Sequence, residues 1–555
     1  MLTQLKKRVV IISVAISATI ILSAAAVKVD LFEVSKNIDI FTTIYKELNT
    51  YYVDEIDPNT LMRTGIDAML ESLDPYTNYI SEAELEGYKF QVTGNYGGIG
   101  ATIRPVDGKI TVIDTHEGFP AFNAGLRPGF IITEIDGKAT NGKNNEEISE
   151  FLRGSPGSTV SIKYTKPFDD QEYQSTIVRE EIKMENVPYY GMVTENIGYI
   201  ILTQFTENSG RNVESALRML KQDHPELSGV ILDLRGNPGG LLREAVNVSN
   251  VFVDKGVEIV STKGKVTEWD KVFTSLNAPL DKTIPLVVLT SRSSASASEI
   301  VAGVIQDYDR GIVVGQKSYG KGLVQTTRDI SYKTKLKLTT AKYYIPSGRC
   351  IQAIDYAHRN EDGSLGKMPD SLKTAFKTAS GRVVYDGGGI DPDITVPTET
   401  YKDITISLIT KDIIFNYATL FQYEHPEITD ARNFSLTDAQ YEDFVKYLAD
   451  KDYDYVTETE LQLSEFEASA VEDQYFDAIK SDIDNLKTLI HHNKETDLYK
   501  FKNEILYELN KEIVGRYYQD VGRIELSFNY DPDIQEAVRV LNELERYEAL
   551  LKPSK

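Results

Sequence analysis

The sequence predicts a multidomain α+β protein in which a layered α/β domain and a glycine-rich β domain lie between helical regions at the two ends of the chain. Apolar strands alternate with apolar-periodic helices from about residue 196 to 345, which is typical of βαβ units. Glycine turns separate short β-type runs from residue 94 onward. The 555 residues are enough for three or four domains of about 150 residues.

Composition excludes several classes of protein. Hydrophobic residues are 41% and charged residues 26% of the chain, which excludes collagen-like, disordered and polytopic membrane proteins. The net charge is −24, and this argues against a nucleic-acid partner because phosphate binding needs clustered cations. The single cysteine, Cys350, excludes an intrachain disulfide and a cysteine-based zinc site, and no histidine lies in an H-E-x-x-H helix. We therefore expect no metal and no cofactor.

The N-terminus has the pattern of an export signal. Lys6, Lys7 and Arg8 precede residues 9–27, which contain no charged side chain. An uncleaved inner-membrane anchor is one interpretation, because the run approaches the roughly 20 residues that span a bilayer. A signal peptide cleaved near the alanines at 24–26 is the other, and the basic flank disfavours a buried core helix. Both predict that the rest of the chain is extracytoplasmic, on the periplasmic side.

The rest of the chain divides into four segments by pattern. Residues 28–93 have apolar residues at helix spacing and predict an N-terminal helical region. Residues 94–183 hold the glycine turns, and residues 184–400 hold the alternating strands and helices. Residues 401–555 predict an acidic helical domain whose role the sequence does not indicate. Within the alternation, strands are predicted at 197–202, 230–234, 284–289 and 312–314, and helices at 213–220, 241–251 and 298–305.

The first segment with chemical potential is a serine run. Residues 293–298 read Ser-Ser-Ala-Ser-Ala-Ser and connect a predicted strand to a predicted helix. A serine at such a turn is exposed beside the helix N-terminus, whose N–H groups and positive dipole end stabilise a developing oxyanion. By itself the segment is more typical of an N-cap or of small-residue packing.

The second segment, residues 318–325, reads Ser-Tyr-Gly-Lys-Gly-Leu-Val-Gln and follows the next predicted strand. Neighbouring strand ends carry the site in layered α/β domains, so Lys321 is expected beside the serines. A lysine kept from water loses its proton more readily and can then accept the proton of Ser296. Gln325 can hydrogen-bond the amine and orient it. An anion-binding turn is the alternative, although no phosphate-loop pattern surrounds Lys321.

A glycine turn supplies the third segment. Residues 233–240 read Asp-Leu-Arg-Gly-Asn-Pro-Gly-Gly after a predicted strand. The N–H of Gly239 or of Gly240 could stabilise an oxyanion together with the N–H of Ala297. The alternative is a tight strand-to-helix connection that simply needs glycine.

Together these segments resemble the carboxyl-terminal processing (tail-specific) serine proteases. The matching residues are 234–242, 294–300, 318–325 and 389–394, in the order and spacing of that family. The resemblance covers about residues 35–398 and implies a crotonase- or Clp-protease-like layered α/β catalytic domain. It implies a Ser–Lys dyad in which Ser296 is the nucleophile, Lys321 the general base and Gln325 the residue that orients the lysine.

Residues 94–183 resemble the PDZ module of the same family. Gly97, Gly98, Ile99 and Gly100 would bind the C-terminal carboxylate of a peptide through backbone N–H groups, and the next strand would pair with that peptide. In the family an arginine after the PDZ helix can couple ligand binding to the active site. Arg153 is the candidate for this sensor, and a solvated loop charge is the alternative.

The sequence therefore predicts a serine endopeptidase that cleaves proteins near C-terminal tails recognised by its PDZ domain. The expected partners are protein or peptide substrates with free tails, and the membrane through the N-terminal segment. The sequence is also compatible with a homo-oligomer. Two other classes are less consistent with the sequence. The Ser–Lys–Gln set disfavours a non-catalytic PDZ scaffold, and the export signal and the PDZ-like segment disfavour a crotonase-like acyl-CoA enzyme.

Overall fold

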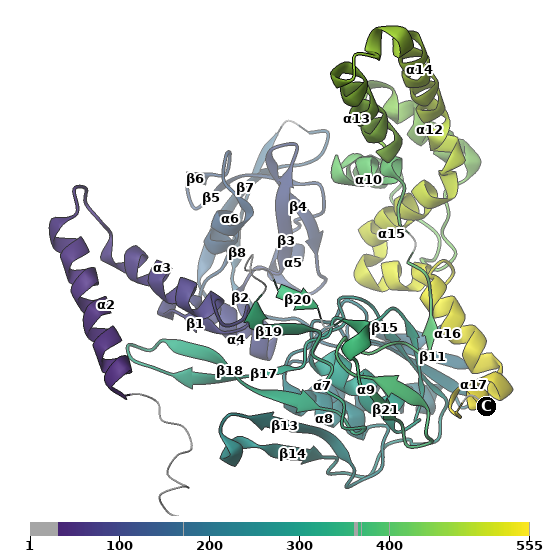
Figure 1. Ribbon diagram of the computed structural model, residues 1–555. Coiled ribbons are helices and arrows are strands. Elements are labelled where there is room, and N and C mark those ends of the chain that lie inside the picture. Colours follow the sequence, from purple (N-terminus) through teal and green to yellow (C-terminus); the bar gives the residue numbers. More distant parts are fainter. Residues whose placement is uncertain (1–30, 170, 360–364, 368, 399, 554–555) are drawn as a thin grey trace, which may run out of the picture. The chain divides into compact units, whose positions relative to one another are not determined.

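The computed structural model describes residues 31–553 apart from 170, 360–364, 368 and 399, and it divides into two compact units, residues 1–79 and 80–555 (Figure 1). Residues 9–27, the predicted export segment, lie outside the described residues. The first unit contains the helices α2 (Leu31–Tyr51) and α3 (Pro58–Glu71), and β1 (Asn78–Ile80) spans the boundary between the two units. Asp57 begins α3 by accepting the N–H groups of Asn59 and Thr60.

The glycine-rich β domain is an antiparallel sheet of order β3-β4-β5-β7-β8, with β6 paired to β5. Strand β3 lies at one edge of this sheet, next to α6. A separate pair, β2 with β9, joins the start of the domain to its end. The elements are β2 (Asn95–Gly98), β3 (Ala101–Val106), β4 (Lys109–Thr115), α5 (Pro120–Asn123), β5 (Ile131–Ile135), β6 (Lys138–Ala139), α6 (Asn145–Leu152), β7 (Thr159–Thr165), β8 (Glu172–Val178) and β9 (Glu180–Lys183).

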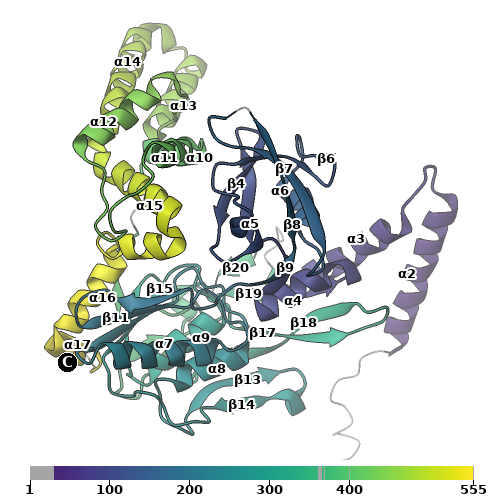
Figure 2. The same cartoon turned by 180° about the vertical axis from the view of Figure 1, so that it is seen from behind.

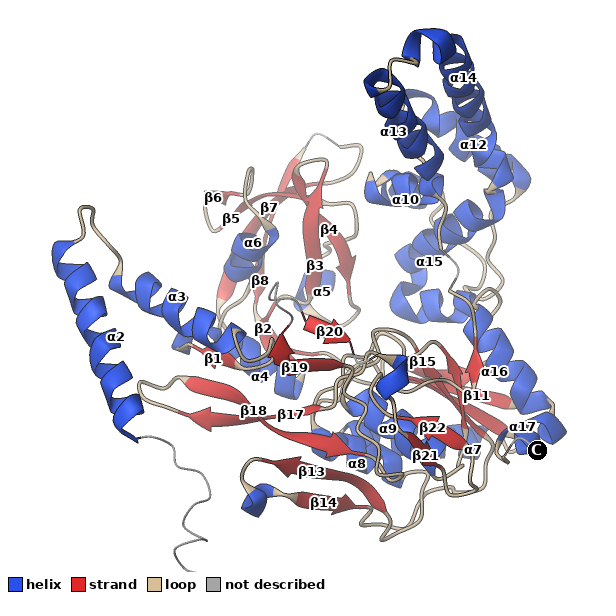
Figure 3. Ribbon diagram, viewed as in Figure 1, coloured by secondary structure: helices blue, strands red, loops and turns tan. Residues whose placement is uncertain are grey.

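A six-stranded sheet of order β10-β11-β12-β15-β16-β23 forms the centre of the layered α/β domain (Figure 3). All its strands are parallel except β10, and they consist mainly of Val, Ile and Leu because helices bury both faces. Helices α7, α8 and α9 cover one face. The elements are β10 (Tyr189–Met192), β11 (Ile197–Ile201), α7 (Ser209–Asp223), β12 (Gly229–Asp233), α8 (Leu242–Asn250), β15 (Leu286–Thr290), α9 (Ala297–Asp307), β16 (Ile312–Gly315) and β23 (Ile394–Thr395).

The opposite face of this sheet is covered by the last two helices of the chain, α16 (Pro532–Asn542) and α17 (Leu544–Leu550) (Figure 2). Ile534 and Val540 of α16 lie in one core with Ile231 and Val287 of the sheet. Residues of the predicted C-terminal helical domain therefore form the third layer of the α/β domain.

A second sheet contains β13 (Glu258–Gly264), β14 (Lys271–Thr274) and a long hairpin made of β17 (Leu323–Asp329) and β18 (Lys335–Tyr344). In the hairpin Gln325 is opposite Thr339, and Thr327 is opposite Lys337. The remaining elements of this part are η1 (Glu82–Glu84), α4 (Leu85–Thr93), η2 (Thr267–Trp269), β19 (Ile354–Arg359), β20 (Leu365–Lys367), η3 (Asp370–Leu372), β21 (Ala375–Lys377) and β22 (Val383–Tyr385).

The other C-terminal helices pack around a core of their own. They are α10 (Asp403–Thr410), α11 (Ile413–Glu424), α12 (Asp438–Tyr447), η4 (Leu448–Asp450), α13 (Glu458–Glu472), α14 (Phe476–Lys500) and α15 (Lys502–Ser527). Among the described residues no single helix is long and apolar enough to cross a membrane. The bent pair α10–α11 passes that test by length and composition, but its apolar side chains form part of the helical core.

Candidate active site

Ser296 occupies the N-cap position of α9, after the loop that follows β15. Its backbone has φ 55° and ψ −111°, a conformation that is rare for residues with a side chain and that clusters at functional sites. The Ser296 side chain lines a cavity of about 470 Å³.

The neighbouring serines of the run have structural contacts instead. The Ser294 hydroxyl donates to the carbonyl of Leu234 at 2.7 Å, and the Ser298 hydroxyl donates to the carbonyl of Asn237 at 2.9 Å. Both side chains are fully buried and neither lines the cavity. Ser296 therefore differs from both neighbours in facing open space.

The cavity brings together residues that are far apart in the sequence. Lys321, Gln325, Gly239 and Gly240 line it together with Ser296. These residues come from the N-cap of α9, the loop after β16, the hairpin strand β17 and the turn after β12. The predicted catalytic serine, lysine and glutamine thus share one cavity.

Glu299 connects the serine turn to the lysine loop. Its buried carboxylate accepts the N–H groups of Ser296 and Lys321 at 2.8 and 2.9 Å, and the N–H of Gly320 and the hydroxyl of Ser318 at 2.7 and 2.6 Å. Burial raises the pKa of this carboxyl, against the four donors, which lower it. Sequence reasoning missed Glu299, although a Glu three residues after an N-cap serine has capping-box spacing.

The glycines beside Lys321 allow the loop to pack closely. A Cβ at Gly320, where φ is +91°, would lie 2.5 Å from the Cβ of Ala353, and a Cβ at Gly322 would lie 2.8 Å from the nitrogen of Gln352. The glycines therefore let the lysine loop lie directly against residues 352–353.

Gln325 lies on β17 with its side chain toward the cavity. Its Nε2 donates to the Thr339 hydroxyl at 3.2 Å. The amide is held by the opposite strand, so its carbonyl oxygen keeps the capacity to accept from an amine.

The glycine turn lies directly against the serine. A Cβ at Gly239 would be 2.8 Å from the Cβ of Ser296 and 2.9 Å from the nitrogen of Ala297. The N–H of Gly239 already donates to the Asn237 side chain at 2.9 Å. Within the described part of the chain, no acceptor takes the N–H of Gly240 or that of Ala297. This geometry favours Gly240 over Gly239 as the partner of Ala297 in an oxyanion hole.

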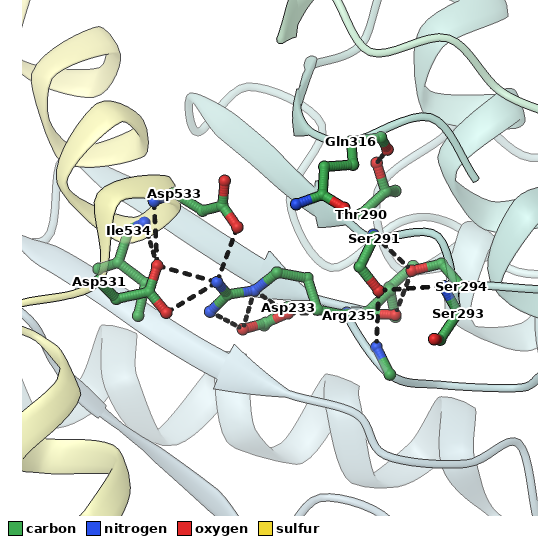
Figure 4. Close-up of polar contacts among 12 residues, drawn as sticks. Asp233, Arg235, Thr290, Ser291, Ser293, Ser294, Gln316, Asp531, Asp533 and Ile534 are labelled. Carbon is green, nitrogen blue, oxygen red and sulfur yellow. Dashed lines mark hydrogen bonds and ion pairs between the residues drawn. The ribbon is translucent and has the colours of Figure 1, made fainter. Parts of the chain in front are cut away.

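Arg235 connects this turn to the C-terminal helices, which the sequence did not indicate (Figure 4). Its guanidinium contacts Asp233 at 2.7 Å and, through Nη1, Asp531 at 2.8 Å and Asp533 at 2.9 Å. Burial lowers the pKa of Arg235, but the carboxylates, above all Asp233, outweigh it and the pKa is raised. Asp531 is also the N-cap of α16. The start of α16 thus holds Arg235 in place, four residues before Gly239 in the glycine turn.

We expect the double substitution Asp531→Asn, Asp533→Asn to lower kcat roughly tenfold, because the turn loses charge-assisted hydrogen bonds worth about 1.5–3 kcal/mol each. Asparagine retains the ability to cap α16, so the helix should persist. Steady-state kinetics and thermal unfolding of the variant measure both effects. Glu545→Gln, an exposed charge on α17, is the matched control. Unchanged kcat in a variant with lowered thermal stability would limit the contact to a stabilising role.

The predicted peptide-binding residues lie at the start of the glycine-rich domain. Gly97 and Gly98 belong to β2 and pair with β9, whereas Ile99 and Gly100 connect β2 to β3. Gly98, Ile99 and Gly100 line a small cavity of about 80 Å³ between β3 and α6, and Arg153 lines it as well. The cavity lies along the unpaired edge of β3, where an extended peptide could add as a strand.

Arg153 follows α6 and is exposed, with its guanidinium 5.8 Å from the centre of the Tyr96 ring. The neighbouring Arg179 is buried and donates to the carbonyls of Phe151 and Leu152 at 2.8 and 3.0 Å. Arg179, which has no local signal in the sequence, therefore holds the end of α6, and Arg153 remains exposed at the small cavity between β3 and α6.

Three family models match the chain. Residues 196–357 match the model described as peptidase family S41, residues 97–177 the model of a PDZ domain, and residues 404–541 the model of a probable PDZ-protease C-terminal helical domain. The class that the fold and the matches define is a multidomain peptidase that carries a PDZ domain.

Two relatives compared by sequence agree with this class. A carboxy-terminal-processing protease of Bartonella bacilliformis is 37% identical over 316 residues, covering 57% of this chain and 72% of the relative. A probable CtpA-like serine protease of Staphylococcus aureus is 32% identical over 378 residues, 68% of each protein. The solved photosystem II D1 C-terminal processing protease is 24% identical, covering 64% of this chain and 92% of that one, with a TM-score of 0.35. The chain belongs to peptidase family S41, and the predicted fold class and family are confirmed.

Proposed function

We propose that this chain is a serine endopeptidase that uses a Ser296–Lys321 dyad to cleave proteins near their C-terminal tails. The observation that carries the proposal is the single cavity lined by Ser296, Lys321 and Gln325. Neutral Lys321 would accept the proton of Ser296 Oγ as that oxygen attacks the substrate carbonyl carbon. Gln325 would accept a hydrogen bond from the lysine amine and fix its direction.

The tetrahedral intermediate that results carries a negative oxygen. In the proposed mechanism the N–H groups of Ala297 and Gly240 donate to it, at the positive end of α9. Lys321 then returns its proton to the leaving amine, which departs and leaves an acyl-enzyme on Ser296. A water molecule activated by the same lysine hydrolyses this ester, and Ser296 regains its proton.

The PDZ domain would recognise the C-terminal tail of the substrate. A C-terminal carboxylate would be held by backbone N–H groups at Ile99 and Gly100, and the peptide would pair with the edge of β3. The adjacent strand pair β2–β9 and the small cavity between β3 and α6 support this placement. An extracytoplasmic location, with residues 9–27 as an anchor or a signal, completes the proposal and follows from the sequence pattern.

We expect amidation of a substrate's C-terminus to weaken its binding by roughly tenfold or more, because charge-assisted hydrogen bonds are worth about 1.5–3 kcal/mol each. Binding of paired free-acid and amide peptides to the full chain carrying Ser296→Ala measures this without cleavage. In the active enzyme the amide should also be cleaved more slowly at a distant internal bond.

The sensor role of Arg153 is tested with the same peptides. Arg153→Ala should reduce the difference in turnover between the free acid and the amide if that residue transmits the signal, whereas Lys138→Ala, an exposed charge of the same domain, should leave it unchanged. Equal binding and equal cleavage of the two peptides by the unmodified enzyme would show that tails are not recognised.

A further inference from the structure

The active-site cavity is lined by a second lysine besides the lysine of the proposed dyad. The chain carries a net charge of −24, yet no Asp or Glu is among the described residues that line this cavity. Its ionisable cations are Lys321 and Lys337. Since Lys321 acts as a neutral base in the proposed mechanism, Lys337 is the side chain that would make this cleft positive. A cleft with a cation and no lining carboxylate attracts anionic groups even on an acidic protein.

Lys337 is not explained by the proposed chemistry. It lies on β18 opposite Thr327, two cross-strand pairs along the hairpin from the pair formed by Gln325 and Thr339. Since side chains two apart on a strand share a face, the side chains of Gln325, Thr327 and Lys337 point into the same cavity. Lys337 is thus displaced along the hairpin from the dyad, where neighbouring residues of a bound chain would lie.

The ammonium group of Lys337 has no partner in the described part of the chain: it forms no hydrogen bond or ion pair there. Burial lowers the pKa of Lys337, and no neighbouring charge contributes to the shift. By contrast, Lys335 on the same strand is paired with Asp329. A half-buried cation without a counter-ion is costly in a structural role, because it loses hydration without gaining a partner.

We propose that Lys337 forms a subsite for a carboxylate of the bound substrate, at a fixed distance along the chain from the cleaved bond. The inference rests on the proposed peptidase function and adds a substrate preference to it. The carboxylate is either an Asp or Glu side chain of the substrate or its free C-terminus, where only a few residues follow the cleaved bond. Both sources present the same two oxygens to the ammonium group.

The test uses variants of one cleaved peptide, in which each position flanking the scissile bond carries in turn Glu or its neutral isostere Gln, as free acid and as amide. For the unmodified enzyme we expect kcat/KM to be about tenfold or more higher for the carboxylate form at one position. In Lys337→Met the carboxylate peptide should fall to the rate of its neutral partner. In Lys337→Glu a Lys-containing peptide should become the preferred substrate.

The ratio of rates is measured within each enzyme preparation, so partial misfolding of a variant does not affect it. Lys342→Met, which removes an exposed charge of the same strand away from the cavity, should keep the preference. A preference that follows the acid–amide pair identifies the C-terminus as the source, and one that follows Glu–Gln identifies a side chain. Three results would overturn the subsite. The unmodified enzyme could show no preference for a carboxylate, the preference could persist in Lys337→Met, or that variant could lose the same factor in kcat/KM for all peptides. Cleavage that persists in Ser296→Ala overturns the proposed function instead.

Discussion

Replacing Ser296 by alanine should lower kcat/KM by at least about 10⁴-fold, because the variant lacks the only nucleophile of the proposed mechanism. The protein should remain folded, since the Ser296 side chain lines a cavity and the turn is held by its backbone N–H on Glu299. Peptide cleavage and thermal unfolding of the purified variant measure both expectations.

Ser294→Ala and Ser298→Ala are the matched controls. Each removes a buried hydroxyl that donates to a backbone carbonyl, so each should cost about 1 kcal/mol of unfolding free energy. Both should retain most of the activity. An inactive but folded Ser294→Ala enzyme, together with an active Ser296→Ala enzyme, would place the nucleophile elsewhere in the run.

Replacing Lys321 by arginine should inactivate the enzyme about as completely as replacing it by alanine. Arginine keeps the positive charge but does not lose its proton near neutral pH, so it cannot accept the proton of Ser296. For the unmodified enzyme the rate should rise with pH, since only the neutral amine acts as a base and its fraction grows as pH rises. The pH–rate profile and the kcat of the two variants are the measurements.

Gln325→Ala should be impaired less than either lysine variant, because Gln325 orients the base without taking a proton. A fully active Lys321→Arg enzyme would exclude the dyad and leave Lys321 an electrostatic role. An inactive Lys321→Arg enzyme thus indicates general-base catalysis, and an active one indicates simple stabilisation of the oxyanion.

The order of strands and helices in the α/β domain could be predicted from the sequence because its strands are buried on both faces. Such strands appear as short apolar runs, and β12, β15 and β16 lie where 230–234, 284–289 and 312–314 predicted them. The resemblance likewise pointed to Ser296, Lys321 and Gln325, which the structure places in one cavity.

Other features depend on contacts between distant segments and have no local signal. The acidic composition of residues 401–555 indicated helices, but not that α16 covers the central sheet or that Asp531 and Asp533 reach Arg235. In the sequence, Lys337 is one of several lysines on an amphipathic strand, and only the hairpin register places it in the cavity. Glu299 has the spacing of a capping residue, which conceals its contact with the lysine loop.

The most direct test of the Ser–Lys dyad is mass-spectrometric mapping of the adduct formed by a fluorophosphonate on the full chain, in which a serine oxygen bonds to phosphorus and fluoride leaves. We expect one adduct, on Ser296, with the other serines of residues 293–298 unmodified. The adduct should form more slowly as pH is lowered and should be lost in Lys321→Met. Modification of a different serine, or of Ser296 at an unchanged rate in Lys321→Met, would contradict it.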